Sequence, residues 1–205
     1  AGEPMRNGSP LTSGEPQPAD HPVVARLRAA GAVVVGITRV PELCVFATTD
    51  SAFGITHNPW DVTRTPGGSS GGSALVVFPG MVPVAHGADG MGSIRIPAAC
   101  CGLVGIKPGS GVVPAHLGPN DWYGMAENGP LATTVADAAL VLSVMADDPE
   151  LAKLREPGRA LRIGVSTKPP IRGVRPDAAR PSAAAPPRRA FARARPPARP
   201  PPPPC

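Results

Sequence analysis

The sequence has few aromatic residues and no long apolar run. Phe, Trp and Tyr together make up 3% of its 205 residues, which leaves few rings on which nucleic-acid bases could stack. No apolar stretch reaches the roughly 18 residues that a membrane-spanning helix needs, and the first residues lack the basic-then-apolar pattern of a secretory signal. We therefore expect no membrane segment, no nucleic-acid partner and a cytoplasmic location.

The cysteines show neither a metal-binding nor a disulfide spacing. Cys44, Cys100, Cys101 and Cys205 include no Cys-x-x-Cys pair, and two of them are adjacent. This pattern fits no zinc site and no disulfide framework. We expect small, buried thiols in a reducing compartment, and we predict no metal and no cofactor.

The positive charge is confined to the C-terminal end. Residues 176–205 hold six Arg and one Asp, which equals the net charge of +5 of the whole chain. The remaining residues are therefore neutral overall and offer no basic face to a nucleic acid. Because this end is almost entirely Pro, Ala and Arg, we predict a disordered tail. A high-GC gene read out of frame gives the same composition, so we expect a truncated or frameshifted product.

Residues 1–175 are expected to form an α/β unit. Asp20 is predicted to cap a helix over residues 21–30, and residues 32–37 are predicted to form a short buried strand. The other expected elements are a helix over 74–78, strands over 82–85, 103–106 and 161–165, and a helix from Thr133 or Thr134 to Met145.

A glycine- and serine-rich run, Gly67-Gly68-Ser69-Ser70-Gly71-Gly72-Ser73, precedes an apolar segment. Such a run can bind an anion at a helix N-terminus, but the lysine of a phosphate-binding P-loop is missing. The run also matches the Gly-x-Ser-x-Gly nucleophile elbow, centred on Ser69 or Ser70. No strand precedes it, however, and His86 and His116, the histidines that follow, lie in no catalytic context. By itself the run could be a flexible turn.

A second run favours a more specific interpretation. The run Asp89-Gly90-Met91-Gly92-Ser93-Ile94-Arg95-Ile96-Pro97 places a serine 24 residues after Ser69, and Gly105-Ile106-Lys107-Pro108 follows it. With residues 48–54 and 58–61, these runs closely resemble the amidase signature family, and weaker similarity covers residues 1–175. The resemblance implies a partial amidase domain over residues 1–175, an α/β fold with a mixed β-sheet covered by α-helices, here incomplete.

The resemblance also implies a chemistry. Members of the family hydrolyse carboxylic amide C–N bonds through an acyl-enzyme intermediate, using a Ser–Ser–Lys triad. Ser93 matches the nucleophile, and Ser69 matches the serine that follows a cis peptide bond and relays the proton of the nucleophile. The implied substrate is a small-molecule amide, and the resemblance does not distinguish a stand-alone amidase from an amidotransferase component.

Further roles follow for the residues around the nucleophile. The resemblance implies an oxyanion hole made by the backbone N–H groups of Gly90, Met91, Gly92 and Ser93. Met91 stands where the family usually has glycine, so its side chain should narrow the mouth of the pocket. Supporting roles without catalysis are expected for Ser70, Asp89 and Arg95, the last two as an ion pair.

The lysine of the triad matches a position before Ala1. Lys107, the first lysine in the sequence, matches a family position that has no proton-relay role. We therefore expect the chain to be inactive alone, either as part of an amidase whose lysine comes from elsewhere or as a non-catalytic remnant. A histidine-dependent serine hydrolase is the third hypothesis.

Overall fold

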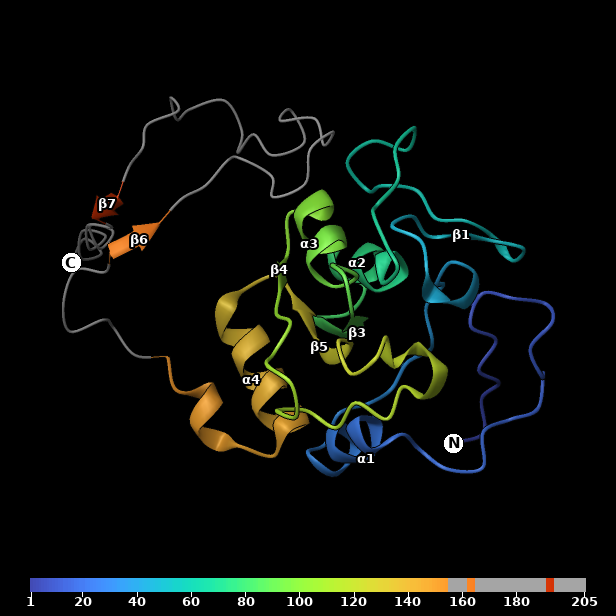
Figure 1. Cartoon of the computed structure of the whole chain (residues 1–205), viewed down its shortest axis with the longest axis horizontal. Helices are drawn as coiled ribbons and strands as arrows, with labels where there is room; N and C mark the ends of the chain where they lie inside the picture. Colours follow the sequence, from blue (N-terminus) through green and yellow to red (C-terminus); the bar gives the residue numbers. More distant parts are fainter. Residues whose placement is uncertain (155–161, 165–190, 194–205) are drawn as a thin grey trace, which may run out of the picture. The chain divides into compact units, whose positions relative to one another are not determined.

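A three-stranded antiparallel sheet lies at the centre of residues 1–154 (Figure 1). Its strands, in the order β3-β5-β4, are β3 (Val84–Asp89), β5 (Glu127–Ala132) and β4 (Val104–Gly105). The computed structural model describes residues 1–154, 162–164 and 191–193, and the chain divides after Leu154 into two units. The central strand β5 pairs with β3 over its whole length and with β4 near its end.

Helices and short elements surround the sheet. The α-helices of the first unit are α1 (Pro22–Ala29), α2 (Gly71–Val77), α3 (Arg95–Cys101) and α4 (Val135–Ala146). A small hairpin pairs β1 (Asp50–Ser51) with β2 (Gly54–Ile55). Short 3₁₀ helices occur at Glu42–Cys44, Gly118–Asp121 and Pro149–Ala152.

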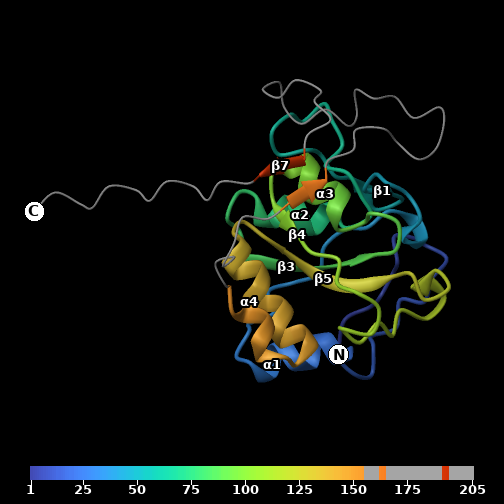
Figure 2. The same cartoon turned by 60° about the vertical axis from the view of Figure 1, so that its left-hand side comes forward.

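The helices cover both faces of the sheet, so the first unit has two apolar cores (Figure 2). On one face α2 and α3 pack against β5, with Ala74, Ile94, Ala98, Cys101 and Leu131 buried together. On the other face α1 packs against α4, with Val23, Val113, Val141, Leu142 and Met145 buried together. The chain is thus an α/β protein, as predicted, and every strand pair in the described ranges is antiparallel.

Several predicted helices are confirmed with corrected ends. Helix α4 begins after Thr134, whose hydroxyl oxygen accepts from the Asp137 amide at 3.1 Å, as a capping threonine does. Helix α2 begins at Gly71, three residues before the predicted start. The cap predicted for α1 was wrong: His21 is the N-cap and accepts from the Val23 amide, while Asp20 pairs with Arg28.

The buried strand predicted over residues 32–37 is not present. This apolar run is irregular and exposed, with Val33 at 84% and Ile37 at 68% exposure. Its backbone finds no partner strand within residues 1–154, and its side chains belong to neither core. An apolar run predicts a strand only where another strand is available to pair with it.

Strand β5, helix α3 and the β1–β2 hairpin were not predicted. Strand β5 has the sequence Glu-Asn-Gly-Pro-Leu-Ala, and its Asn-Gly-Pro core is typical of turns rather than of a central strand. It is nevertheless buried at all six positions, and the carbonyl of Pro130 accepts from the Ile106 amide at 3.2 Å. The strand predicted over 82–85 continues to Asp89 as β3, and α3 follows the serine run directly.

The second unit is described at two short strands. Strand β6 (Arg162–Gly164) pairs antiparallel with β7 (Phe191–Arg193), which confirms the strand expected over 161–165. Strand β7 lies inside the Pro/Ala/Arg-rich tail. The rest of the tail lies outside the described residues.

Candidate active site

The glycine- and serine-rich run forms a closely packed loop before α2. The peptide bond between Gly68 and Ser69 is cis, as the resemblance implies. Thr49 holds the loop from both sides, because its buried hydroxyl donates to the Gly67 carbonyl at 2.8 Å and accepts from the Gly71 amide at 3.1 Å. A Cβ atom on Gly68 would lie 2.0 Å from the Thr48 carbonyl oxygen, so this position requires glycine.

The same loop attaches to the outer edge of β3. The hydroxyl of Ser70 lies 3.3 Å from the Ala88 amide and 3.4 Å from its carbonyl, and the hydroxyl of Ser73 donates to the His86 carbonyl at 2.8 Å. These serines take the place of a neighbouring strand, since β3 is at the edge of its sheet. Ser70 and Ser73 therefore hold the loop against β3.

The second serine run folds around one carboxylate. Asp89 is fully buried at the end of β3 and accepts hydrogen bonds from the backbone amides of Gly92, Ile94 and Arg95, at 2.6, 3.2 and 3.3 Å. It also accepts from the Arg95 guanidinium, at 2.9 Å from Nε and 3.0 Å from Nη2. The predicted Asp89–Arg95 pair is thus present. Because the acceptor is one rigid group, it fixes the backbone on both sides of Ser93.

The electrostatics keep this carboxylate ionised. Burial raises the pKa of Asp89, but the hydrogen bonds from the Arg95 guanidinium and from the three amides outweigh it, so the pKa lies below its ordinary value. The same pair raises the pKa of Arg95. The loop is therefore organised by a charged group throughout the neutral pH range.

The structure brings the two serine runs together. The amide of Ser70 donates to the carbonyl of Ser93 at 3.1 Å, so the residue next to Ser69 touches the predicted nucleophile directly. Ser69 is 5% exposed, whereas Ser93 is partly exposed. One serine is thus inside the loop and the other is open to an incoming molecule.

Of the four N–H groups predicted as oxyanion donors, one already has an acceptor in the structure. The N–H of Gly92 already donates to Asp89, so it is not free to bind a developing oxyanion. The N–H groups of Gly90, Met91 and Ser93 donate to no acceptor among the described residues. The Met91 side chain is 71% exposed and lies at the surface of this loop.

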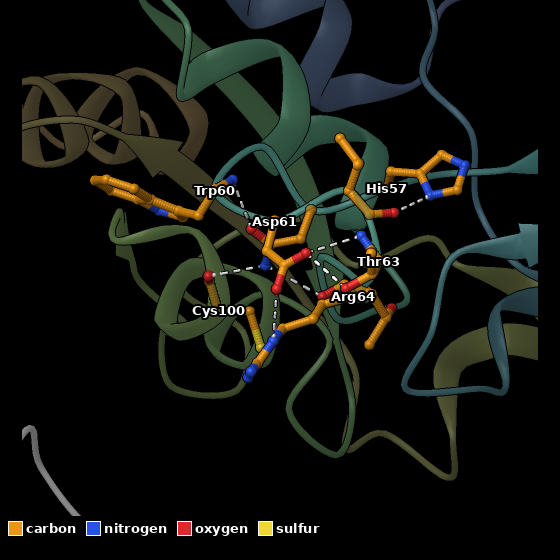
Figure 3. Close-up of polar contacts among 9 residues, drawn as sticks. His57, Trp60, Asp61, Thr63, Arg64 and Cys100 are labelled. Atoms are coloured by element: carbon orange, nitrogen blue, oxygen red, sulfur yellow. Dashed lines mark hydrogen bonds and ion pairs between the residues drawn. The ribbon is translucent and has the colours of Figure 1, made fainter.

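A polar loop secures the far end of α3 (Figure 3). Asn58 donates to the carbonyls of Thr65 and Cys100, at 3.2 and 3.1 Å, and accepts from the Trp60 amide at 2.9 Å. The indole N–H of Trp60 donates to the Cys101 carbonyl at 3.0 Å. The carbonyls at the end of α3 are thereby satisfied, and the helix that follows Ser93 is fixed at both ends.

The loop itself is closed by side-chain bonds around Asp61. Its carboxylate accepts from the amide and hydroxyl of Thr63, at 2.9 and 2.6 Å, and pairs with Arg64 (Figure 3). These bonds lower the pKa of Asp61, the hydroxyl of Thr63 contributing most. The Arg64 amide also donates to the Asp61 carbonyl at 3.0 Å, so these residues form a turn.

The histidines make contacts elsewhere. The Nε2 atom of His86 lies 2.8 Å from Oδ1 of Asn128, and three residues along β3 separate it from Asp89, so the two side chains leave opposite faces of the strand. The ring of His116 lies edge-on to that of His21, with centroids 6.0 Å apart. Neither histidine contacts a predicted catalytic serine in residues 1–154.

Thr49, Asn58 and Trp122 were not assigned roles from the sequence. Thr49 and Asn58 lie in the runs 48–54 and 58–61, which resemble the amidase signature family. That resemblance could have pointed to them as site residues. Trp122 had no such signal: it follows a 3₁₀ helix and lies against Gly90, where a Cβ atom would be 3.2 Å from the indole. It therefore borders the loop that contains Ser93 from a distant part of the sequence.

The described thiols are not nucleophiles of this site, and that of Cys101 donates to the Pro66 carbonyl at 3.6 Å, just before the glycine- and serine-rich run. Burial raises the pKa of Cys44 and of Cys100. Burial and the neighbouring Cys100 raise the pKa of Cys101 to about 11. These groups are free cysteines and stay protonated at neutral pH, although Cys100 is exposed rather than buried as predicted.

The fold and the joined serine loops are those of an amidase-signature α/β protein. A family model described as Amidase matches residues 1–185, which extends ten residues beyond the boundary expected from composition. The chain belongs to the Amidase family.

Named relatives agree with this assignment. The chain is 50% identical over 179 residues to AmiB2 of Mycobacterium tuberculosis, which is named as a putative amidase. The alignment covers 83% of the chain and 38% of AmiB2. It is 44% identical over 147 residues to an acylamidase of Rhodococcus erythropolis, covering 68% of the chain and 31% of the relative. The chain thus spans about a third of the length of these relatives.

Solved structures show the same fold. A 6-aminohexanoate cyclic dimer hydrolase superposes with a TM-score of 0.62 at 38% identity, over 80% of the chain and 33% of that enzyme. A bacterial aryl acylamidase of the amidase signature family superposes with a TM-score of 0.62 at 36% identity, over 70% of the chain and 31% of that enzyme. In the part of this chain that the structure describes, no helix is long and apolar enough to cross a membrane.

Proposed function

We propose that this chain carries the nucleophile half of an amidase, with Ser93 attacking the carbonyl carbon of a small-molecule amide. The attack forms a C–O bond and drives electrons onto the carbonyl oxygen. The free N–H groups of Gly90, Met91 and Ser93 would stabilise that oxyanion, each typically by about 2.7–4 kcal/mol. Collapse would expel the amine, which takes up the proton that Ser93 gave to the base, and leave an acyl-enzyme, which water then hydrolyses.

The observation that carries the proposal is the hydrogen bond from the Ser70 amide to the Ser93 carbonyl. It brings the residue next to Ser69 into contact with Ser93, although the two serines lie 24 positions apart in sequence, and this supports Ser69 as the relay. A hydroxyl both donates and accepts, so Ser69 is suited to pass the proton of Ser93 onward. The buried Asp89 supports the arrangement by holding the backbone around Ser93.

The proton finally needs a base. Among the described residues no lysine or histidine bonds to the hydroxyl of either serine, and Lys153 pairs with Glu150. We therefore propose that the base is a lysine from a segment before Ala1, and that the chain alone turns over amides negligibly. Loss of one triad member in other serine hydrolases lowers turnover by about 10⁴–10⁶.

Release of p-nitroaniline from p-nitroacetanilide tests the proposal. The chain and its Ser93→Ala variant should both stay at background, because a neutral hydroxyl is a poor nucleophile. A small amine in the buffer should raise the rate of the parent chain by accepting the proton, and should not raise the rate of Ser93→Ala. Ser13→Ala, an exposed serine in a loop, is the matched control and should respond like the parent.

The remaining outcomes decide between the hypotheses. Turnover without added amine, lost in Ser93→Ala, would mean that this chain contains its own base. An identical response of the parent and Ser93→Ala to the amine would refute Ser93 as the nucleophile and favour a non-catalytic remnant.

A further inference from the structure

The indole ring of Trp122 packs on the loop that contains Ser93. A Cβ atom added to Gly90 would lie 3.2 Å from Cγ and 3.4 Å from Cδ1 of the ring, so the ring contacts the backbone of Gly90. The Trp122 side chain is nevertheless partly exposed. An indole that touches this loop and keeps accessible surface is available to a molecule that binds there.

The end of the sheet accounts for this contact. Asp89 and Glu127 are the last paired residues of β3 and β5. The two chain segments stay together beyond this pair, because a Cβ atom on Gly90 would be 3.5 Å from that of Ala126. The turn before Ala126 then folds Trp122 back over Gly90. The ring thus lies against a residue whose N–H is a proposed oxyanion donor.

A turn with unfavourable backbone angles holds the ring in place. Trp122 and Tyr123 have φ angles of +54° and +58°, in the left-handed region that residues with a side chain rarely adopt. The Asp121 carbonyl accepts from the Ala126 amide at 2.9 Å, and the Asp121 carboxylate accepts from the Tyr123 amide at 3.0 Å. The Trp122 carbonyl accepts from the Met125 amide at 3.2 Å. Such strained segments cluster where a functional group must be positioned.

Two methionines add apolar surface next to this contact. Met91 follows Gly90 and is 71% exposed, and Met125 precedes Ala126 and is 49% exposed. Each therefore lies one residue from the place where the two segments meet. Indole rings and thioether sulfurs both make favourable contacts with aromatic rings. This combination of side chains favours a flat aromatic group over a charged one.

We propose that Trp122 is a specificity-determining residue, whose indole contacts an aryl group of the amide substrate. The step rests on the proposed function: a carbonyl oxygen held by the N–H groups of Gly90, Met91 and Ser93 would bring its substituents next to the indole. An aryl group there would lie offset or edge-on to the indole, with ring centroids about 4.5–7 Å apart. Trp122 takes no part in proton transfer and acts by positioning the substrate.

Binding of acetanilide to the ¹⁵N-labelled chain tests the proposal without requiring hydrolysis. The sequence has two tryptophans, and loss of one indole N–H signal in Trp122→Phe identifies that of Trp122. The Trp122 signal should shift and saturate, whereas that of Trp60, which donates to the Cys101 carbonyl, should not. N-cyclohexylacetamide, which is similar in size but not aromatic, should bind at least about threefold more weakly.

Two variants of Trp122 separate the aromatic contact from simple bulk. Trp122→Phe keeps an aromatic ring and should bind acetanilide within about threefold of the parent. Trp122→Leu keeps apolar bulk without a ring and should bind at least about fivefold more weakly. Tyr123→Leu is the matched control, because it changes the neighbouring aromatic residue, which is fully exposed. It should bind acetanilide like the parent.

Any of three results would overturn the proposal: no saturable shift of the Trp122 signal, equal affinity for the two amides, or unchanged affinity in Trp122→Leu. The first two need no variant, so they decide the matter even if Trp122→Leu does not fold. Ser93→Ala should bind acetanilide like the parent. Failure of the amine rescue with this binding intact would therefore refute the nucleophile alone, and successful rescue without the binding would refute the role of Trp122 alone.

Discussion

Replacing Asp89 with asparagine should destabilise the chain more than any change of an exposed carboxylate. Asparagine keeps the size of aspartate but exchanges one acceptor oxygen for an N–H₂ group. Three backbone amides and the Arg95 guanidinium converge on the two oxygens of Asp89. The new N–H₂ group would therefore face other donors, and the loop around Ser93 would lose the acceptor that shapes it.

The size of the effect follows from burial. Hydrogen bonds to a charged group contribute about 1.5–3 kcal/mol each, and breaking a buried ion pair costs about 3–5 kcal/mol. Arg95 is half exposed, so solvent can rehydrate its side of the pair and the lower end of that range applies. We expect a loss of about 3 kcal/mol in the free energy of unfolding, which for a chain of this size corresponds to a fall of roughly 6–12 °C in Tm.

Thermal unfolding followed by circular dichroism measures this loss. Asp61→Asn is the matched control, because Asp61 also accepts from an amide, a hydroxyl and an arginine but lies in an exposed loop. Its Tm should change little, since surface ion pairs contribute weakly. Equal losses in the two variants would refute the argument that burial of Asp89 makes its hydrogen bonds strong.

The pH dependence provides a second measurement on the same pair of proteins. The folded state lowers the pKa of Asp89, so its contribution is fully present above the unfolded pKa of about 3.9 and is lost as pH falls through the folded pKa. The stability difference between the parent chain and Asp89→Asn should therefore be constant near neutral pH and shrink below about pH 4. A difference that grows with acidification would contradict the sign of the shift.

Three further predictions concern the supports of the site. Asn58→Ala should lower the free energy of unfolding by about 2–3 kcal/mol, because it leaves the carbonyls of Thr65 and Cys100 without their donor; denaturant titration measures it. Ser73→Ala should speed amide hydrogen exchange along β3, since the His86 carbonyl at the sheet edge loses its donor. Cys101, fully buried and with its pKa raised to about 11, should react with iodoacetamide at pH 8 after denaturation but not before, as peptide mass spectrometry would show.

The sequence was sufficient for elements whose signals are local. Thr134 and the apolar positions after it predict α4 because a cap and a 3.6-residue period lie within one segment. For residues 32–37 and 127–132 the local pattern predicts the wrong structure. Three consecutive valines suggest a buried strand where none forms, and Asn-Gly-Pro suggests a turn where the central strand runs. In both cases the outcome depends on whether a partner strand is present, which no local pattern contains.

In the candidate site, too, some features could be predicted from the sequence and others could not. Ser69 and Ser93 could be singled out because their two runs together resemble the signature of the amidase signature family. The hydrogen bonds of the site could not, because each joins residues distant in sequence: the Ser70 amide with the Ser93 carbonyl, and the Thr49 hydroxyl with the glycine loop. Even within one run, the sequence offered Gly92 as an oxyanion donor, while the fold directs its N–H to Asp89.

The hydrogen bond from Gly92 to Asp89 shapes the whole loop around Ser93. A glycine at position 92 has a φ of +127°, and a Cβ atom there would lie 2.7 Å from Ile96, so the residue is glycine for backbone reasons and not to leave room for a substrate. Its N–H closes the turn onto Asp89, whereas the N–H groups of Met91 and Ser93 on either side donate to no acceptor among the described residues. The same carboxylate that removes one donor from the proposed oxyanion hole thereby fixes the orientation of the others, and donors held in place before the reaction stabilise a developing charge without reorganisation.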